Sequence, residues 1–219
     1  MKVILFGATG MVGQGVLREC LVDPGVTQVL AIGRNASGKH DPKLKDLVLP
    51  DLFHYEAVAS QLTGYDACFF CLGISSAGMS EADYRRITYD LTLAAADALV
   101  KLNPDMTFIY VSGQGTDSSE QGRSMWARVK GATENALLAL PFKAAYMFRP
   151  GIIRPLHGIR SKTPLYQAFY AAFRPLLGLM AWLSPDSLTS TEQMGRAMIH
   201  AARDGAPLRH LGNRDINRL

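Results

Sequence analysis

Residues Lys2–Gly13 read KVILFGATGMVG, an apolar run followed by a glycine-rich turn. The run predicts a short buried strand, and Met11–Val22 has the pattern of a helix closed by Asp-Pro-Gly. Gly7 permits a tight turn, Gly10 lets the backbone approach a ligand, and Gly13 allows close helix–strand packing. The free N–H groups of a helix N-terminus favour anions. We therefore expect this turn to hold the pyrophosphate of an NAD(P) cofactor.

Strand-like and helix-like segments alternate along the rest of the chain to about residue 149. This alternation predicts a parallel sheet covered by helices on both faces. The further strands are expected at 26–32, 47–49, 66–72, 107–111 and 144–148, and the helices at 55–62, 81–102 and 125–140. Six strands in this rhythm predict an α/β fold with a doubly wound parallel sheet, the Rossmann fold.

The C-terminal part departs from this rhythm. Thr189 and Glu192 stand at capping-box spacing and predict a helix that runs to about Arg203. The stretch 164–183 is apolar and aromatic, and it approaches the length of a membrane span. Arg174-Pro175 in its middle instead indicates a broken helix pair without stable membrane insertion. Without a linker, residues 1–219 are predicted to form a single domain, with 155–190 as a small helical cap on the substrate side.

The composition narrows the class of protein. With 48% hydrophobic and 19% charged residues, the 219-residue chain resembles an ordinary globular protein. The net charge of +4 comes from scattered Lys and Arg, which does not indicate nucleic-acid binding and suits an anionic small molecule. Three cysteines make no disulfide framework, and no secretory signal is recognisable, so a cytoplasmic location is expected. Cys68 and Cys71 should point to opposite faces of a strand and hold no metal.

The end of the second strand bears on the choice of cofactor. NAD-binding Rossmann proteins place an acidic residue about 20 residues after the glycine turn, where it binds the ribose 2′-hydroxyl. Here Arg34 occupies that position, followed by Lys39 and His40. A guanidinium pairs with a 2′-phosphate that a carboxylate would repel. We therefore expect NADP (NADPH) to be preferred over NAD.

Several motifs in order make the chain resemble a known family. The GxxGxxG spacing resembles that of the extended and atypical short-chain dehydrogenase/reductases, including the NAD(P)H-binding, epimerase-like group related to the human HIV Tat-interacting protein. Five further motifs resemble this family's: Asp51-Leu52 beside the adenine, Cys71-Leu72-Gly73 in the cofactor wall, Val111-Ser112-Gly113 at the family's Ser motif, Arg149-Pro150-Gly151-Ile152 beside the nicotinamide, and Lys130-Gly131-x-x-Glu134 on a helix. The resemblance implies cofactor contacts from Gly7, Thr9, Gly10, Met11, Val12, Gly13, Arg34, Asp51, Leu52, Cys71, Leu72, Gly73, Ser112, Lys130, Pro150, Gly151 and Ile152.

The sequence departs from this family where its chemistry is carried out. The family uses a Tyr four residues before the Lys as general acid/base, and that position holds Trp126, whose indole cannot exchange a proton at useful pH. Gly113 stands where a catalytic Ser is often found, so Ser112 is expected to line the cofactor instead. Lys130 should still bind the nicotinamide ribose.

A substitute acid would restore the chemistry. His157 follows the Arg-Pro-Gly turn and has a pKa suited to proton transfer, although a loop His bonded to backbone is the alternative. Tyr89, Tyr166 and Tyr170 are weaker candidates. Two functions therefore stay open: an NADP(H)-dependent reductase, dehydrogenase or epimerase-like enzyme for a small, partly apolar carbonyl or hydroxyl compound, or a catalytically impaired NADPH sensor or scaffold. Either protein would be a monomer or homodimer. A membrane-associated protein is the third interpretation of the sequence.

Overall fold

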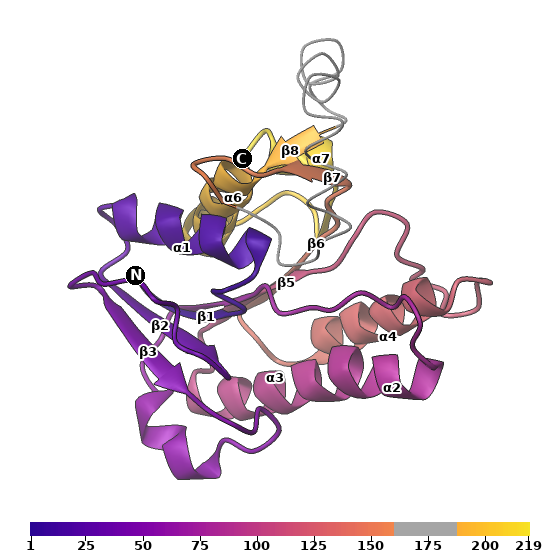
Figure 1. Ribbon diagram of the computed structural model, residues 1–219, viewed down its shortest axis with the longest axis horizontal. Helices are drawn as coiled ribbons and strands as arrows, with labels where there is room; N and C mark the ends of the chain where they lie inside the picture. Colours follow the sequence, from indigo (N-terminus) through magenta and orange to yellow (C-terminus); the bar gives the residue numbers. More distant parts are fainter. Residues whose placement is uncertain (160–187) are drawn as a thin grey trace.

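A parallel sheet of seven strands crosses the computed structural model, which describes residues 1–159 and 188–219 (Figure 1). The strand order is β3-β2-β1-β4-β5-β6-β9, so the chain builds one half of the sheet and then returns past β1 to build the other. This reversal is the mark of the doubly wound Rossmann sheet that the sequence predicts, and the fold class is confirmed. The strands are β1 (Lys2–Phe6), β2 (Gln28–Gly33), β3 (Leu44–Val48), β4 (Ala67–Phe70), β5 (Thr107–Val111), β6 (Ala144–Phe148) and β9 (His210–Leu211).

Helices cover both faces of this sheet (Figure 1). Helices α1 and α6 pack side by side on one face, and α3 and α4 cover the other. A small parallel pair, β7 (Ile152–Arg154) with β8 (Leu188–Ser190), lies beside α6 and α7. The helical segments are α1 (Met11–Val22), the 3-10 turn η1 (Glu56–Gln61), α2 (Glu81–Arg85), the π turn η2 (Arg86–Asp90), α3 (Leu91–Leu102), α4 (Met125–Ala139), α6 (Thr191–Asp204) and α7 (Asn213–Ile216).

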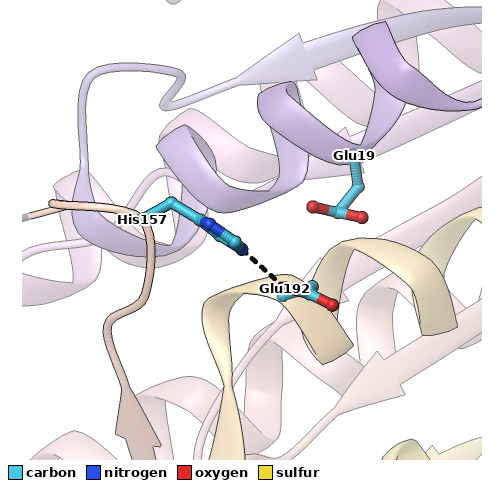
Figure 2. A group of neighbouring side chains, drawn as sticks. All are labelled: Glu19, His157 and Glu192. Atoms are coloured by element: carbon cyan, nitrogen blue, oxygen red, sulfur yellow. Dashed lines mark hydrogen bonds and ion pairs between the residues drawn. The ribbon is translucent and has the colours of Figure 1, made fainter.

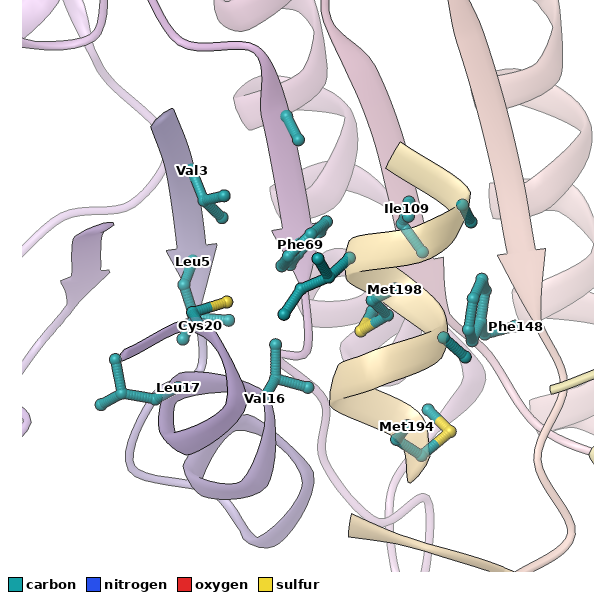
Figure 3. Close-up of a cluster of buried hydrophobic side chains, with 14 of the residues drawn as sticks. Val3, Leu5, Val16, Leu17, Cys20, Phe69, Ile109, Phe148, Met194 and Met198 are labelled. Atoms are coloured by element: carbon teal, nitrogen blue, oxygen red, sulfur yellow. The ribbon is translucent and has the colours of Figure 1, made fainter. Parts of the chain in front are cut away.

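The strands are apolar along their whole length because both of their faces are buried. Successive side chains of a strand point to opposite faces. Val3 and Leu5 of β1 therefore pack under α1 and α6, in a core that includes Met198 (Figure 3). Ile4 and Phe6 of the same strand pack in the second core, under α3 and α4. All strand pairs of the sheet are parallel, so the carboxyl ends of the strands, and the loops that follow them, lie along one edge.

The two cysteines of the CxxC motif lie on different faces, as the sequence predicts. Cys68 is buried in the core under α3, whereas Cys71 packs against the core under α1 and α6. Burial raises the pKa of both thiols above the ordinary value. The pair is therefore structural and forms no shared metal site.

Three features differ from the sequence predictions. The helix predicted at 81–102 is interrupted by the π turn Arg86–Asp90. Strand β9 was missed because its two residues are too few to show a strand pattern. The capping-box prediction was wrong by one residue. The side chain of Ser190 accepts a hydrogen bond from the Gln193 backbone N–H at 3.0 Å, because Ser190 is the residue directly before α6, which begins at Thr191. The broken helix pair predicted at 164–183 falls outside the described residues.

Candidate functional site

A cavity of about 1120 Å³ lies at the carboxyl ends of β1, β2 and β4. Ligands of doubly wound sheets bind at this edge, where the strand order reverses. Four of the predicted motifs meet here, namely the glycine turn, the end of β2 with Arg34, the Asp51-Leu52 segment after β3, and the Cys71-Leu72-Gly73 turn after β4. The predicted cofactor residues that line the cavity are Gly7, Thr9, Gly10, Met11, Arg34, Asp51, Leu52, Cys71, Leu72 and Gly73.

The glycine turn is built by close backbone contacts. Gly7 has a φ of +81°, and a Cβ there would lie 2.7 Å from the Leu72 backbone nitrogen. The Gly10 N–H donates a hydrogen bond to the Gly7 carbonyl at 2.9 Å. A Cβ on Gly13 would overlap that same carbonyl and lie 2.6 Å from its carbon. Val12, by contrast, packs against the core and does not line the cavity.

The first turn of α1 is open to an anion. Its N-cap, Gly10, offers no side-chain hydrogen bond to the free N–H groups, and no acidic residue stands in the first turn. A helix N-terminus carries a partial positive charge. A phosphate placed against this turn would therefore find donors that the protein itself does not use.

The β2 end of the cavity presents one free cation. Arg34 is exposed and makes no hydrogen bond or ion pair with any residue that the structure describes. The carboxylate of Asp46 on β3 also lines this end, but Ser37 occupies both of its oxygens, through the backbone N–H at 3.0 Å and the hydroxyl at 2.9 Å. The guanidinium is thus available to a ligand, while the neighbouring carboxylate is already bonded.

The opposite wall is shaped by the segment after β3. Asp51 accepts hydrogen bonds from the Phe53 N–H at 2.8 Å and from the His54 ring at 2.7 Å. The hydrogen bond with His54 lowers the pKa of Asp51, and the same bond raises the pKa of His54. Arg86 of the π turn lies over the Phe53 ring, 5.8 Å from its centroid, and both line the cavity.

A second cavity, of about 570 Å³, adjoins the first at Ile74, which lines both. It lies at the carboxyl ends of β5 and β6 and collects the residues expected near the nicotinamide. Its described lining includes Ser112, Gly113, Trp126, Lys130, Pro150, Gly151 and Ile152. The Ser112 hydroxyl lies 2.8 Å from that of Thr116, so it is bonded within its own loop.

Lys130 is the only cationic side chain among the described residues of this second cavity. Its Nζ lies 3.5 Å from the Tyr110 hydroxyl and 3.5 Å from the Val111 carbonyl oxygen. Burial lowers the pKa of Lys130 to about 8, and the nearby Glu134 carboxylate partly opposes this. Lys130 is therefore mostly protonated at neutral pH yet able to release its proton in mildly basic solution.

The Lys-Gly-x-x-Glu motif positions the neighbouring turns. A Cβ on Gly131 would lie 2.6 Å from the carbonyl carbon of Asp117, so only glycine lets α4 approach that loop. Glu134 is fully buried and forms an ion pair with Arg149, whose Nε donates to one carboxylate oxygen at 3.0 Å. Arg149 begins the Arg-Pro-Gly turn, and the Gly151 N–H donates to the Asn213 side chain at 3.0 Å. These contacts hold Pro150 and Gly151 against the second cavity.

The structure places His157 elsewhere (Figure 2). Its Nε2 lies 2.5 Å from a Glu192 oxygen, and it lines neither of the two cavities. The ion pair lowers the pKa of Glu192, chiefly through this hydrogen bond. This placement disfavours His157 as the substitute acid. The assignment of His157 to that role stays a prediction. Tyr89 packs under the Arg85 guanidinium, 4.0 Å from the ring centroid, and also lines neither cavity, whereas Tyr166 and Tyr170 lie outside the described residues.

Glu19 approaches the same pair, and ligand atoms of Glu19, His157 and Glu192 all lie within 4.8 Å of one another. Arg18 forms an ion pair with Glu19, and Arg196 forms ion pairs with both carboxylates. The two guanidinium groups already neutralise the two carboxylates, so a divalent cation would have to displace them. We interpret this cluster as an ion-pair network that ties α1 to α6.

A family model described as NAD(P)H-binding matches residues 7–140. The chain belongs to this NAD(P)H-binding family. The match covers the glycine turn, the first cavity and most of α4, including Lys130. The resemblance to an NAD(P)H-binding group that the motifs predict is thereby confirmed, and solved short-chain dehydrogenase/reductases and epimerases share the fold of this chain.

The comparisons with individual proteins agree on the fold. "Protein fmp52, mitochondrial" from Emericella nidulans is 29% identical over 212 residues, covering 91% of this chain and 86% of the relative. The enzyme WbmF of Bordetella bronchiseptica, solved with NAD+, is 15% identical with a TM-score of 0.68, covering 99% of this chain and 76% of that one. A short-chain dehydrogenase of Burkholderia cenocepacia, solved with NADP, is 14% identical with a TM-score of 0.64, covering 96% and 86%.

One sequence prediction is overturned by these comparisons. A cytoplasmic location was expected because no targeting signal was recognised, but several fungal relatives are named as mitochondrial proteins. The cytoplasmic prediction was therefore wrong. Within residues 1–159 and 188–219, no helix has both the length and the apolar character needed to cross a bilayer.

Sequence reasoning missed several lining residues of the second cavity, and Tyr84 is the one among them with an ionisable side chain. It lies near the start of the predicted 81–102 helix, where an aromatic residue is usually core or wall. The usable signal was its place after β4, because the loop that follows a parallel strand returns along the ligand-binding edge.

Proposed function

We propose that this chain binds NADP(H) in preference to NAD(H) and acts as an oxidoreductase or epimerase-like enzyme on a small, partly apolar carbonyl or hydroxyl compound. The observation that carries the proposal is the first cavity, which is lined by both the uncapped α1 N-terminus and the free Arg34. The turn would hold the pyrophosphate, and Arg34 would pair with the 2′-phosphate. The engagement of Asp46 by Ser37 supports this choice, because the carboxylate there is already bonded.

The residues of the second cavity would act on the nicotinamide end. Lys130 would bind the ribose hydroxyls through its ammonium group, and Ser112, Pro150, Gly151 and Ile152 would shape the wall beside the ring. The dinucleotide, when bound, supplies or accepts a hydride. We also propose a single domain with residues 155–190 over the substrate side, a monomeric or homodimeric state, and a mitochondrial location like that given in the relatives' names.

Calorimetric titration of NADPH and NADH tests the cofactor choice. We expect the parent to bind NADPH at least roughly tenfold more tightly, a difference of about 1.4 kcal/mol. Arg34→Asp should remove or reverse this preference. Arg123→Asp, the same charge change at an exposed residue that lines neither cavity, should preserve it. Equal affinities of the parent for NADPH and NADH would refute the preference.

An NADPH-binding sensor or scaffold is the second candidate, and it rests on a specific observation. Trp126 and Gly113 line the second cavity at the positions where the family has its Tyr and often its Ser. Incubation of the protein with NADPH and a panel of small aldehydes and ketones separates the two functions. Measurable oxidation of NADPH supports the enzyme, whereas tight NADPH binding without turnover across the panel supports the sensor.

A further inference from the structure

The second cavity has few groups able to exchange a proton. Of the described residues that line it, only Tyr84 and Lys130 carry ionisable side chains. The remaining polar groups are the hydroxyls of Ser75, Ser76 and Ser112, the Gln114 amide and the Trp126 indole, none of which titrates at useful pH. A proton donor contributed by this lining therefore has to be the tyrosine or the lysine.

Tyr84 is held firmly in this position. It is 2% exposed and projects from α2, a short helix whose first turn is capped by the Ser80 side chain accepting from the Asp83 N–H at 3.1 Å. Glu81 of α2 forms an ion pair with Arg128 of α4 at 2.6 Å. Helix α4 also carries Lys130, so this contact joins the element that bears the phenol to the element that bears the ammonium group.

Tyr110, a buried residue of β5, is a close neighbour of Lys130. Its hydroxyl is 3.5 Å from the Lys130 Nζ, and Nζ lies 5.2 Å from the centre of its ring. Burial raises the pKa of Tyr110, and the Tyr84 hydroxyl adds to that rise, which shows that the two phenols are electrostatic neighbours. Burial also raises the pKa of Tyr84, so its phenol is protonated at neutral pH. A donor must start in that protonated state.

We propose that Tyr84 donates the proton in this site, in place of the tyrosine that Trp126 replaces. The inference rests on the proposed oxidoreductase function. In reduction, the carbonyl carbon of the substrate gains a hydride from the reduced nicotinamide dinucleotide, and the carbon–oxygen double bond becomes single. The oxygen takes the phenolic proton of Tyr84, so the substrate gains two electrons and the dinucleotide loses them. The phenolate left on Tyr84 would share its cavity with the Lys130 ammonium group, the only cation among the described lining residues, and would regain its proton from water.

Kinetics of Tyr84→Phe with the best substrate of the carbonyl panel tests the proton transfer. This variant keeps the ring and loses only the hydroxyl. We expect kcat to fall roughly 10²–10⁴-fold, the usual contribution of a general acid, with the Kd for NADPH unchanged. Tyr89→Phe is the matched control, because Tyr89 lies a few residues further along and lines neither cavity, and its kcat should be unchanged. Turnover of Tyr84→Phe equal to that of the parent would overturn the assignment of Tyr84 alone.

A second measurement needs neither cofactor nor substrate. Ultraviolet difference spectroscopy follows tyrosine ionisation in the parent and in Tyr84→Phe, and their difference is the titration of Tyr84. Lys130→Met should move this titration to higher pH, since the phenolate loses its neighbouring positive charge. A titration that Lys130→Met leaves unchanged would overturn the pairing of the two residues. A parent that binds NADPH but reduces nothing in the panel would overturn both the enzyme function and the donor role, while the spectroscopic result would stand separately.

Discussion

Two glycines of the phosphate turn lie three residues apart but have different tasks, which paired substitutions should separate. A Cβ on Gly13 would overlap the Gly7 carbonyl group, whose oxygen already accepts the Gly10 N–H. A Cβ on Gly10 would meet the same oxygen at 3.3 Å, which a shift of a few tenths of an ångström relieves. Gly10 also has a φ of −79°, which alanine adopts without strain. Gly13→Ala therefore disturbs the packing of α1 on β1, whereas Gly10→Ala mainly places a methyl group over the anion site.

The expected magnitudes follow from these contacts. Overpacking of a filled site costs about 1–3 kcal/mol, and occasionally more, so we expect Gly13→Ala to lose about 3 kcal/mol of unfolding free energy because its neighbours are backbone atoms. For a chain of this size, that loss lowers Tm by roughly 6–12 °C. Gly10→Ala exchanges one helix N-cap for a poorer one and should lose roughly 1 kcal/mol. It should nevertheless weaken NADPH binding at least roughly tenfold.

Urea unfolding followed by circular dichroism measures the first effect, and calorimetric titration with NADPH measures the second. If Gly13→Ala is as stable as the parent, the close approach of α1 to the turn is not real. If Gly10→Ala is stable and binds NADPH as tightly as the parent, the pyrophosphate does not lie on this turn.

Three further predictions address the residues around the second cavity. Glu134→Ala should lose roughly 3–5 kcal/mol of unfolding free energy in urea, because it leaves Arg149 without its buried partner. Glu134→Gln keeps an acceptor oxygen and should lose less. Equal losses in the two variants would argue against the ion pair. His157→Ala should leave NADPH affinity and any turnover unchanged, since His157 lines neither cavity. If the variant instead loses turnover, and the parent's pH–rate profile shows a group that titrates at about pH 6–7, His157 would be the acid. The lowered pKa of Lys130, about 8, means that the unfolded chain binds more protons than the folded one between that pH and the ordinary lysine pKa. The stability of the parent should therefore rise relative to Lys130→Met as pH increases from 8 to 10, and a flat difference would contradict the shift.

The parts of the site that were predictable from sequence are those built by local backbone. The Gly7–Gly13 turn is specified by the strand before it and the helix after it, so spacing alone places it. Arg34 lines the first cavity beside the glycine turn because parallel strand β2 ends at the same edge as β1. Parallel strands bring their carboxyl ends together whatever their side chains are, and this rule carried most of the prediction.

The parts that were missed depend on contacts between distant segments. His157 follows the Arg-Pro-Gly turn in sequence, but the pairing of β7 with β8 carries the chain away, and a φ of +56° at His157 directs its side chain toward Glu192. Tyr84 reaches the second cavity because α2 packs on α4, which no periodicity within residues 81–102 reveals. The Ser190 cap was misplaced by one residue because β8, which pairs with a segment far away in sequence, runs to Ser190, so that α6 begins at Thr191.

The separation between binding and chemistry in this site has a physical origin. The proposed cofactor contacts come largely from backbone groups, such as the α1 N-terminus and the Gly7 turn, and these depend on spacing rather than on one side chain. Replacing a tyrosine by Trp126 on α4 leaves that backbone intact and leaves Lys130 one helical turn further along the same face. A proton donor is more demanding, because it must project into the cavity from a second element that is fixed against α4. The Glu81–Arg128 ion pair is partly exposed and contributes little energy by itself, so the burial of Tyr84 must supply most of the fixing. The same buried ring thus anchors α2 and presents the hydroxyl, which is why Tyr84→Phe, with the ring retained, tests the chemistry without loosening the site.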